Sequence, residues 1–414
     1  MNAQASTPTV FDVQRIRADF PLLSRTVHGK PLVYFDNANT SQKPLSVIEA
    51  MNCHYREHNA NVSRAVHLLG EEATAAYEGA RDKLAQFINA PSCNELILTS
   101  GTTQATNLVA YSYALPRLQP GDAILTTVME HHANIVPWQL VADRSGATVK
   151  AAPINQRGEL IVEQYIAMLT PEVKLACVTH VSNVLGTVNP VREIARECRK
   201  RGIPLLVDGS QAVPHRPVDV QALGCDFYAL TGHKMLGPTG TGALWAKREH
   251  LESMPPFFGG GEMIREVRFD GTTFAEPPHK FEAGTPNIAG FVGLAAAIDY
   301  YQSVGFEAIH AWEQQLLTYA TERLREIPGL RIVGEAAEKE AVISFLIEGA
   351  QATDLATLLD LQGVAVRSGH HCAHPLMQFF GVPSTLRASL AFYNTREEVD
   401  DFIVALLKVR KLLL

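Results

Sequence analysis

The sequence predicts an α/β protein: a large domain with a mostly parallel, helix-covered sheet, followed by a smaller α+β domain. Between residues 95 and 208, short apolar runs alternate with segments of helical periodicity, which is typical of parallel strands covered on both faces. After residue 286, long helical segments with few strands replace this alternation. We predict an N-terminal tail and arm over residues 1–30, a large domain over 31–295 and a small C-terminal domain over 296–414, with which the N-terminal segment can pack.

Helices of the N-terminal arm and the large domain are predicted where apolar residues recur at intervals of three and four. They cover residues 13–20, 44–57, 71–88, 104–115, 134–144, 162–169 and 191–201. Short apolar runs bounded by turn residues predict the buried strands of the large domain. They cover residues 32–35, 96–99, 123–126, 148–152, 174–179, 204–208 and 225–230.

The C-terminal part has a different pattern of predicted elements, because its helices are longer and its strands are separated by irregular intervals. We predict helices over residues 290–301, from there to near 328, over 353–361 and over 397–412. Strands are predicted over residues 331–333, 342–347, 364–366 and 386–391.

The composition excludes several classes of function. Hydrophobic residues make up 46% and charged residues 19% of the chain, as in ordinary globular proteins. The net charge of −7 argues against nucleic acid or an anionic membrane as the main partner. No apolar run reaches the ~18 residues of a membrane span, and Met1 to Val10 lacks the features of a secretory signal. The six cysteines include no Cys-x-x-Cys pair, which favours reduced thiols, and we expect a cytoplasmic protein.

Lys234 is the first candidate for chemistry. It follows the predicted strand over residues 225–230 and precedes a glycine-rich turn over 237–242. Open α/β sheets bind ligands at such strand ends. A lysine held partly out of water loses basicity and becomes an amine nucleophile able to form a Schiff base. A lysine between turn residues can equally be an ordinary surface charge.

Other polar residues follow neighbouring predicted strands. The stretch Ser100 to Thr103 opens a helix and suits a phosphate, although it can also be a simple helix cap. His131 can stack on an aromatic ring or serve only a structural role. Asp208 ends a buried strand and needs a positive or hydrogen-bonding partner, such as a protonated pyridine nitrogen, and Gln211 can donate to a ring oxygen. Together with Lys234, these residues predict a site for pyridoxal 5′-phosphate (PLP).

Several stretches resemble the class V aminotransferase-like family of PLP enzymes, which have fold type I. They are Glu130–Asn134, Asp208–Gln211, Thr231–Lys234 and Phe281–Asn287. Within this family, Arg367-Ser-Gly-His-His-Cys372-Ala-His-Pro375 is similar to the cysteine loop of group II, Suf-type, cysteine desulfurases. Group I desulfurases carry their cysteine in a longer, serine-rich loop. The resemblance extends from Asp36 to the terminal helix.

The resemblance implies a role for each matching residue at the cofactor. Lys234 would bind PLP as a Schiff base and move protons, and Asp208 would keep the pyridine nitrogen protonated. Gln211 would contact the phenolic oxygen, and His131 would stack on the ring. The implied phosphate contacts are Thr102, Thr103, Thr231, His233 and, from the other subunit of a homodimer, Thr285.

The resemblance also implies the reaction. Asn183 would line the site, Arg387 and Arg367 would bind the substrate carboxylate, and Cys372 would be the nucleophile that takes the sulfur. L-cysteine would become L-alanine, with a persulfide left on Cys372. The sulfur would then pass to a SufE- or SufU-type acceptor protein for Fe–S cluster assembly.

Two departures and three alternatives belong to this interpretation. Asn39 replaces a small residue of the family pattern, and Ser63 and Ala65 alter a His-Arg-Gly-x-His loop. A selenocysteine lyase, or another class V enzyme such as a transaminase, would keep PLP and change the reaction. A metal-binding module at His370 to His374 is the second alternative, but zinc motifs usually space their ligands, and we assign no metal ligand. The third is a structural thiol on an ordinary globular scaffold, with no chemistry at the loop.

Overall fold

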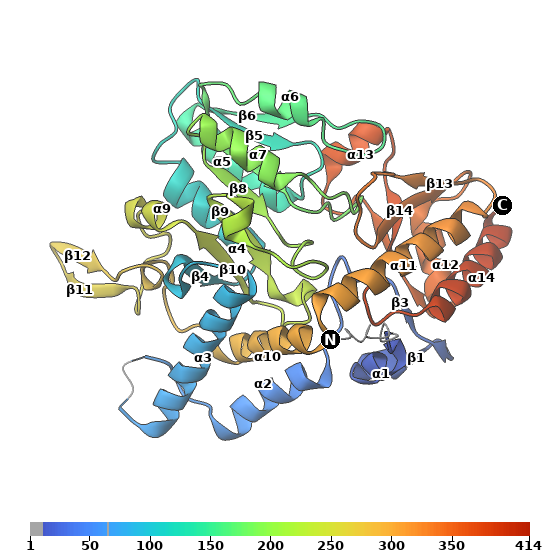
Figure 1. The fold of residues 1–414 in the computed structure, drawn as a ribbon, viewed down its shortest axis with the longest axis horizontal. Helices are drawn as coiled ribbons and strands as arrows, with labels where there is room; N and C mark the ends of the chain where they lie inside the picture. The colour runs from blue at the N-terminus through green and yellow to red at the C-terminus, as the bar shows by residue number, and fades with distance from the viewer. Residues whose placement is uncertain (1–10, 64–65) are drawn as a thin grey trace, which may run out of the picture.

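The computed structural model describes residues 11–63 and 66–414. Residues 1–10 of the predicted N-terminal tail and arm, and the departure at Ala65, lie outside the described residues. Figure 1 shows the large sheet and its helices beside a smaller unit that contains β13, β14, α11, α12 and α14.

The large sheet has seven strands in the order β4-β10-β9-β8-β7-β5-β6. Their bounds are β4 Leu96–Thr99, β5 Ala123–Thr127, β6 Thr148–Ala152, β7 Val173–Thr179, β8 Leu205–Asp208, β9 Phe227–Thr231 and β10 Gly242–Ala246. The strands from β9 to β6 pair in parallel, whereas β10 is antiparallel to both of its neighbours. The prediction of a mostly parallel sheet is confirmed. The sequence analysis missed β10, because this strand follows directly on the glycine-rich turn.

Helices cover both faces of this sheet. Successive residues of a strand point to opposite faces, so Leu206 packs into one core while Leu205 and Val207 pack into the other. The first core lies against α4 and α5, and the second against α3, α7 and α10. The helices of this unit are α2 Leu45–Glu57, α3 Leu68–Phe87, α4 Thr102–Leu108, α5 Val136–Ser145, α6 Val162–Ala167, α7 Val191–Lys200, α8 Val220–Leu223, α9 Arg248–Ser253 and α10 Ile288–Val304.

One predicted helix changes its geometry halfway. The segment predicted as a single helix over residues 104–115 is α-helical to Leu108 and then π-helical over Val109–Ala114. Its buried residues, among them Leu108 and Val109, still form one continuous apolar face. Apolar periodicity therefore located the segment but could not distinguish the two helical geometries.

The smaller unit is an antiparallel sheet packed against long helices. Its strand order is β13-β14-β17-β16, with β13 Leu330–Val333, β14 Val342–Ile347, β16 Arg367–Gly369 and β17 Thr385–Ser389. The helices α11 Phe306–Arg325, α12 Ala352–Asp360 and α14 Arg396–Leu413 belong to it, whereas α13 His374–Phe380 packs its buried Leu376 and Met377 into the core of the large unit. The predicted boundary between residues 295 and 296 falls within α10, and the domain division stays a prediction.

The N-terminal arm joins the smaller unit. Its elements are α1 Val13–Ala18, β1 Thr26–Val27, β2 Lys30–Pro31 and β3 Val33–Tyr34. Strand β3 pairs in parallel with β15 Val364–Ala365, and Val33 and Phe35 pack into the core of the smaller unit. This pairing brings Asp36, which follows β3, next to Ser389 at the end of β17.

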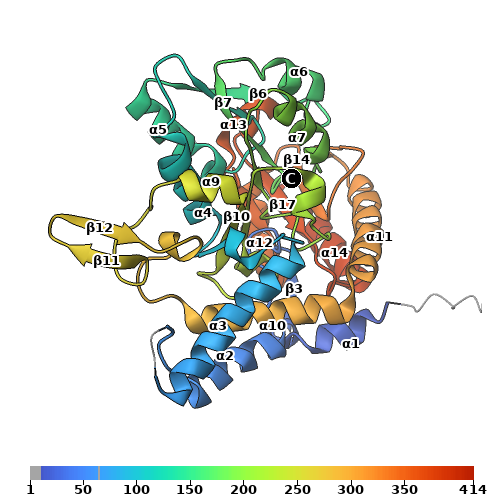
Figure 2. The ribbon, with the colours of Figure 1, turned by 60° about the vertical axis from the view of Figure 1, so that its left-hand side comes forward.

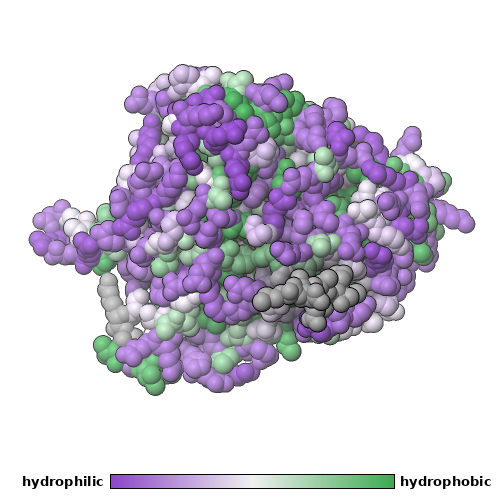
Figure 3. Space-filling model, viewed as in Figure 1, coloured by the Kyte–Doolittle hydropathy of each residue, from purple (hydrophilic) through white to green (hydrophobic). Residues whose placement is uncertain are grey.

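A hairpin that the sequence analysis missed projects from the large unit. Strands β11 Ile264–Arg268 and β12 Gly271–Phe274 are almost entirely exposed, and Figure 2 shows them extending away from the body of the molecule. Hydrophilic residues dominate the face drawn in Figure 3, with only scattered hydrophobic patches. None of the helices in the described part of the chain is long and apolar enough to cross a bilayer.

Candidate active site

A cavity of about 400 Å³ lies where the parallel strands of the large sheet end. Thr179, Asp208 and Thr231, the last residues of β7, β8 and β9, all line it. The other predicted site residues in its lining are Thr102, Thr103, His131, Asn183, Gln211, His233 and Lys234. Asn39, one of the departures from the family pattern, also faces the cavity. The carboxyl-end rule for open α/β sheets thus located most of the site.

Lys234 is the last residue of a short 3₁₀ turn that directly follows β9. Burial lowers the pKa of its ammonium group to about 8, although the nearby Asp208 carboxylate opposes this shift. The turn is held firmly, because the carbonyl of His233 accepts hydrogen bonds from Thr40 Oγ1 at 2.9 Å and Lys43 Nζ at 2.9 Å. Near neutral pH, an appreciable fraction of Lys234 is therefore the free amine in a fixed position.

Asp208 and Gln211 present unpaired atoms beside this lysine. Asp208 Oδ1 accepts hydrogen bonds from Ser210 N at 2.9 Å and Ser210 Oγ at 2.6 Å, which orients the carboxylate. Gln211 Nε2 donates to Ala38 O, whereas the buried Gln211 Oε1 has no partner among the described residues. A buried amide oxygen without a partner is costly, so its position indicates a ligand that completes the site.

The start of α4 forms a cradle for an anion. Gly101 has a φ of +147° and lies so close to Thr231 that an added Cβ would sit 3.3 Å from its Oγ1, which favours glycine here. Thr102 Oγ1 shares a 2.6 Å hydrogen bond with Ser210 Oγ. In the first turn of a helix, backbone N–H groups have no acceptor within the helix, and Thr102 and Thr103, the first two residues of α4, line the cavity.

His131 is held in one protonation state and one orientation. Its Nδ1 accepts a hydrogen bond from Ala133 N at 3.0 Å, and burial, reinforced by Lys234, lowers the pKa of the ring to about 4. Glu130, behind it, is fully buried and ties β5 to β7 by accepting hydrogen bonds from Thr127 Oγ1 and Thr179 N. The neutral imidazole of His131 therefore presents a fixed face to the cavity.

Cys372 lies on a tight loop between β16 and α13 and is exposed. His371 and Cys372 have φ values of +52° and +55°, a left-handed conformation that is rare for two successive side-chain-bearing residues. The loop is fixed from the large unit. His132 N donates to Cys372 O at 2.8 Å, and Asn183 Nδ2 donates to His371 O at 2.8 Å. Asn183 thus faces the cavity and holds the cysteine loop at the same time.

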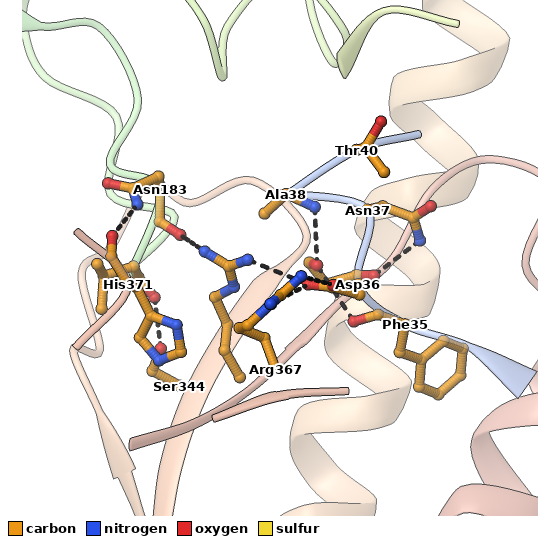
Figure 4. A network of polar contacts seen from close by, with 12 residues as sticks. Phe35, Asp36, Asn37, Ala38, Thr40, Asn183, Ser344, Arg367 and His371 are labelled. Carbon is orange, nitrogen blue, oxygen red and sulfur yellow. Dashed lines mark hydrogen bonds and ion pairs between the residues drawn. The ribbon is translucent and has the colours of Figure 1, made fainter. Parts of the chain in front are cut away.

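The two predicted carboxylate-binding arginines both contact Asp36, and Figure 4 shows Arg367 next to this carboxylate. Arg387 is buried and donates from Nη2 to Asp36 Oδ1 at 3.3 Å and from Nη1 to Asn183 O at 2.8 Å. Arg367 is more exposed and donates from Nη2 to Asp36 Oδ2 at 2.7 Å. Arg387 Nε has no partner among the described residues, and burial lowers the pKa of this guanidinium to about 10. The group keeps its charge and retains an N–H for a ligand.

Two observations fall outside the sequence-based prediction. Thr285 is exposed and does not line the cavity, so this chain by itself does not bring it to Lys234. Asp36, Ser210 and Glu130 orient predicted site residues but were not assigned a role. Each of them lies inside or beside a stretch that carries the family resemblance, yet only the fold shows which side chains they contact.

Comparison with known proteins gives the class to which this geometry belongs. The aminotransferase class-V family matches residues 33–402. The chain belongs to this family of PLP-dependent enzymes, as its fold type I sheet and lysine predicted.

Within that family, the chain groups with cysteine desulfurases. A probable cysteine desulfurase of Xylella fastidiosa (strain 9a5c) is 64% identical over 413 residues, which cover 100% of this chain and 99% of the relative. The cysteine desulfurase of Serratia proteamaculans (strain 568) is 50% identical over 404 residues, covering 97% of this chain and 99% of that protein. The crystal structure of the cysteine desulfurase CsdA of Escherichia coli, in an S-sulfonic acid form, has a TM-score of 0.91 and 41% identity, covering 98% of this chain and all of the other.

Proposed function

We propose that this protein is a PLP-dependent cysteine desulfurase that converts L-cysteine to L-alanine and keeps the sulfur as a persulfide on Cys372. One observation carries the proposal. The exposed Cys372 stands on a left-handed loop that Asn183 ties to the wall of the cavity containing Lys234. A transaminase would need the lysine but not a cysteine held in this way.

The cavity fits PLP on the evidence of its own donors and acceptors. The orphaned Gln211 Oε1, the Asp208 carboxylate and the N–H groups at the start of α4 suit a ligand with a polar ring and a phosphate. When bound, PLP supplies an electron sink conjugated with the α-carbon of an amino acid. Asp208 would hold a proton on the pyridine nitrogen, and the neutral His131 would stack on the ring.

The remaining cofactor contacts follow from the cavity lining. Lys234 would bind PLP through its amine and, once released, carry protons at the substrate carbons. The proposed phosphate contacts are Thr102, Thr103, Thr231 and His233. Thr285 would reach the phosphate of the other subunit's cofactor, because it is exposed on this chain and does not line its own cavity.

Arg387 would bind the α-carboxylate of the substrate through the N–H groups that Asp36 and Asn183 leave free. Two guanidinium groups and one carboxylate leave a net positive charge in this corner of the site, which a substrate carboxylate would neutralise. Arg367 would assist from the solvent side. Asn39 would narrow the space next to the substrate, since it lines the same cavity.

Cys372 would act as a thiolate. Its sulfur attacks the sulfur of the substrate, a sulfur–sulfur bond forms, and the carbon–sulfur bond of the substrate breaks. The electron pair of that bond stays with the carbon skeleton, which takes up a proton and leaves as alanine. The sulfur transferred to Cys372 is then available to an acceptor.

The test is to incubate the purified holoenzyme with L-cysteine and to measure both alanine and the mass of the Cys372 peptide. We expect alanine and a mass increase of one sulfur atom on Cys372. Cys372→Ala should retain the visible absorbance of bound PLP yet release no alanine. Cys53→Ala, at a half-buried cysteine, is the matched control and should turn over normally. Normal turnover by Cys372→Ala would contradict the proposal.

We further propose a group II, Suf-type, enzyme that works in the cytoplasm as a homodimer. The short loop between β16 and α13 supports group II, and the exposed position of Thr285 supports a second subunit. A SufE- or SufU-type protein would accept the sulfur for Fe–S cluster assembly. Parallel assays with L-cysteine and L-selenocysteine would decide between a desulfurase and a selenocysteine lyase, and sedimentation would test the dimer.

A further inference from the structure

Three histidines surround the backbone of Cys372. His132 follows β5, whereas His370 and His374 flank the cysteine in its loop. A single ring nitrogen from each of the three lies within 4.8 Å of the other two. His132 Nε2 is 3.0 Å from His374 Nδ1, and the planes of these rings differ by only 2°. The cluster therefore joins the large unit to the cysteine loop, and His132 Nε2 also accepts a hydrogen bond from His374 N at 3.2 Å.

Distances in this cluster are close to those of a zinc site. Zinc binds imidazole nitrogen at about 2.0–2.1 Å in a tetrahedron, so two ligand nitrogens lie roughly 3.3 Å apart. The separation between His132 and His374 is already near this value. The His370 ring stacks on that of His374 with centroids 3.7 Å apart, so one ring must turn before its lone pair meets the other two. His374 is exposed, and its ring can turn if it gives up the 3.0 Å hydrogen bond between its Nδ1 and His132 Nε2.

The cluster also differs from the other groups of potential ligands in the described part of the chain. Those groups combine Cys53, Glu57 and His58, or Asp226, Glu249 and His250. His58 and Asp226 are already engaged in ion pairs with Glu72 and Lys247. The three-histidine cluster contains no carboxylate, and burial together with its two histidine neighbours lowers the pKa of His132.

We propose that His132, His370 and His374 form a zinc site that restrains Cys372 and blocks its reactions. Three imidazoles leave the fourth zinc position open for water or for the Cys372 thiolate. In either case the ion closes the loop on both sides of the cysteine and limits access to its sulfur. Zinc binding here is independent of the proposed function, whereas its use to regulate sulfur transfer rests on that function.

The first experiment measures zinc binding to the tag-free, metal-free holoenzyme by competition with a chromophoric chelator. We expect one tightly bound ion per chain. His374→Gln and His132→Gln should each weaken binding by at least about 100-fold, since losing even a hydrogen-bond partner behind a ligand costs about 10–100-fold. His58→Gln is the matched control and should change nothing. Cys372→Ser should retain the site, because the imidazoles hold the ion.

Two results would overturn the site: unchanged zinc binding in both histidine variants, or loss of binding in His58→Gln alone. A site that needs Cys372 but neither His132 nor His374 would overturn it as well. None of these measurements depends on turnover, so a failure of the proposed desulfurase activity would be recognised separately.

The second experiment follows the alkylation of Cys372 by iodoacetamide, identified by peptide mass. It omits the substrate, because cysteine itself chelates zinc. At a zinc concentration ten times the Kd, about one tenth of the chains stay free, so alkylation should slow about tenfold and recover with a chelator. His374→Gln should show no slowing at that concentration. Equal slowing in this variant and in the wild type would refute protection by the cluster.

Discussion

The two residues that we propose to be reactive, Lys234 and Cys372, are held in opposite ways. Lys234 lies on a turn at the end of a buried strand, and the walls of its cavity are the ends of β7, β8 and β9. Cys372 is exposed on a loop whose left-handed backbone is fixed by hydrogen bonds from the other unit. Burial lowers the pKa of the lysine, whereas hydrogen bonds between the two units fix the backbone of the cysteine loop.

This difference separates the chemistry that any PLP enzyme needs from the chemistry that depends on the cysteine. A buried lysine with a lowered pKa can serve any PLP reaction, and its cavity is built from one sheet. The cysteine acts only if the smaller unit presents it at the right place, and Asn183 spans the two through His371 and Arg387. Mutations should therefore affect the two residues separately, except at Asn183.

The largest effect is expected for Lys234→Ala. Without the amine, PLP has no covalent attachment, and desulfurase activity should fall by at least about 1000-fold. The alkylation rate of Cys372 should stay within about twofold of the wild type, because no hydrogen bond links the lysine to the loop among the described residues. Visible absorbance, alanine release and peptide mass check these outcomes. Strongly altered alkylation would show that the two regions are not separate.

Asn183→Ala should break the connection between the cavity of Lys234 and the loop of Cys372. It removes the donor to His371 O and relaxes the left-handed pair, and a displacement of about 1 Å near the reacting atoms can cost about 100-fold in rate. We expect desulfuration to fall by about 10–100-fold while PLP absorbance is retained. Asn189→Ala is the control, because this buried asparagine donates to Thr179 O and does not touch the loop. Single-turnover kinetics should find the loss in persulfide formation; a loss confined to PLP binding would contradict this role.

The contrast also explains what the sequence could and could not predict. Apolar runs identified the parallel strands, and strand ends located Asp208 and Lys234, because that rule depends only on chain order. Asp36 was missed because its partners Arg367 and Arg387 lie more than 300 positions away and meet it only through the pairing of β3 with β15. Cys372 was found by resemblance, since nothing in the local pattern announces a left-handed turn between two histidines.

The pH dependence of PLP attachment should report mainly the burial of Lys234. The pKa of Lys234 lies at about 8, so the free amine becomes the main form above that pH. The rate at which apoprotein forms its Schiff base should rise about tenfold per pH unit up to about pH 8 and then level off. His131 and His233, with pKa values of about 4, do not titrate in this range.

A control variant and a variant that shifts the pKa of Lys234 make this prediction more specific. Lys43 has a pKa of about 7, so Lys43→Met tests whether that group, rather than Lys234, sets the profile. Asp208 raises the pKa of Lys234, so Asp208→Asn should move the midpoint to lower pH. A rate that is flat between about pH 6 and 9 would contradict the lowered pKa of Lys234.

The smallest effect is expected from a substitution in the smaller unit that touches neither the cavity of Lys234 nor the loop of Cys372. Thr395 caps α14: its Oγ1 accepts from Glu398 N at 3.1 Å, and its N–H donates to Glu398 Oε2 at 2.9 Å. Thr395→Ala should lower the free energy of unfolding by about 1 kcal/mol and the Tm by roughly 1–2 °C in calorimetry. Thr395→Ser keeps the capping oxygen and should restore most of the loss.

Activity and Cys372 alkylation should be unchanged in Thr395→Ala at temperatures well below the Tm. The cap supports α14, which packs in the core of the smaller unit, whereas Asn183 and His132 of the large unit hold the backbone carbonyls of the loop, and His371 Nε2 makes a further 2.9 Å hydrogen bond with Thr385 Oγ1 of β17. If alkylation of Cys372 changes as much as it does in Asn183→Ala, the loop depends on its own unit for its shape. The hydrogen bonds from the large unit would then be a consequence of that shape and not its cause.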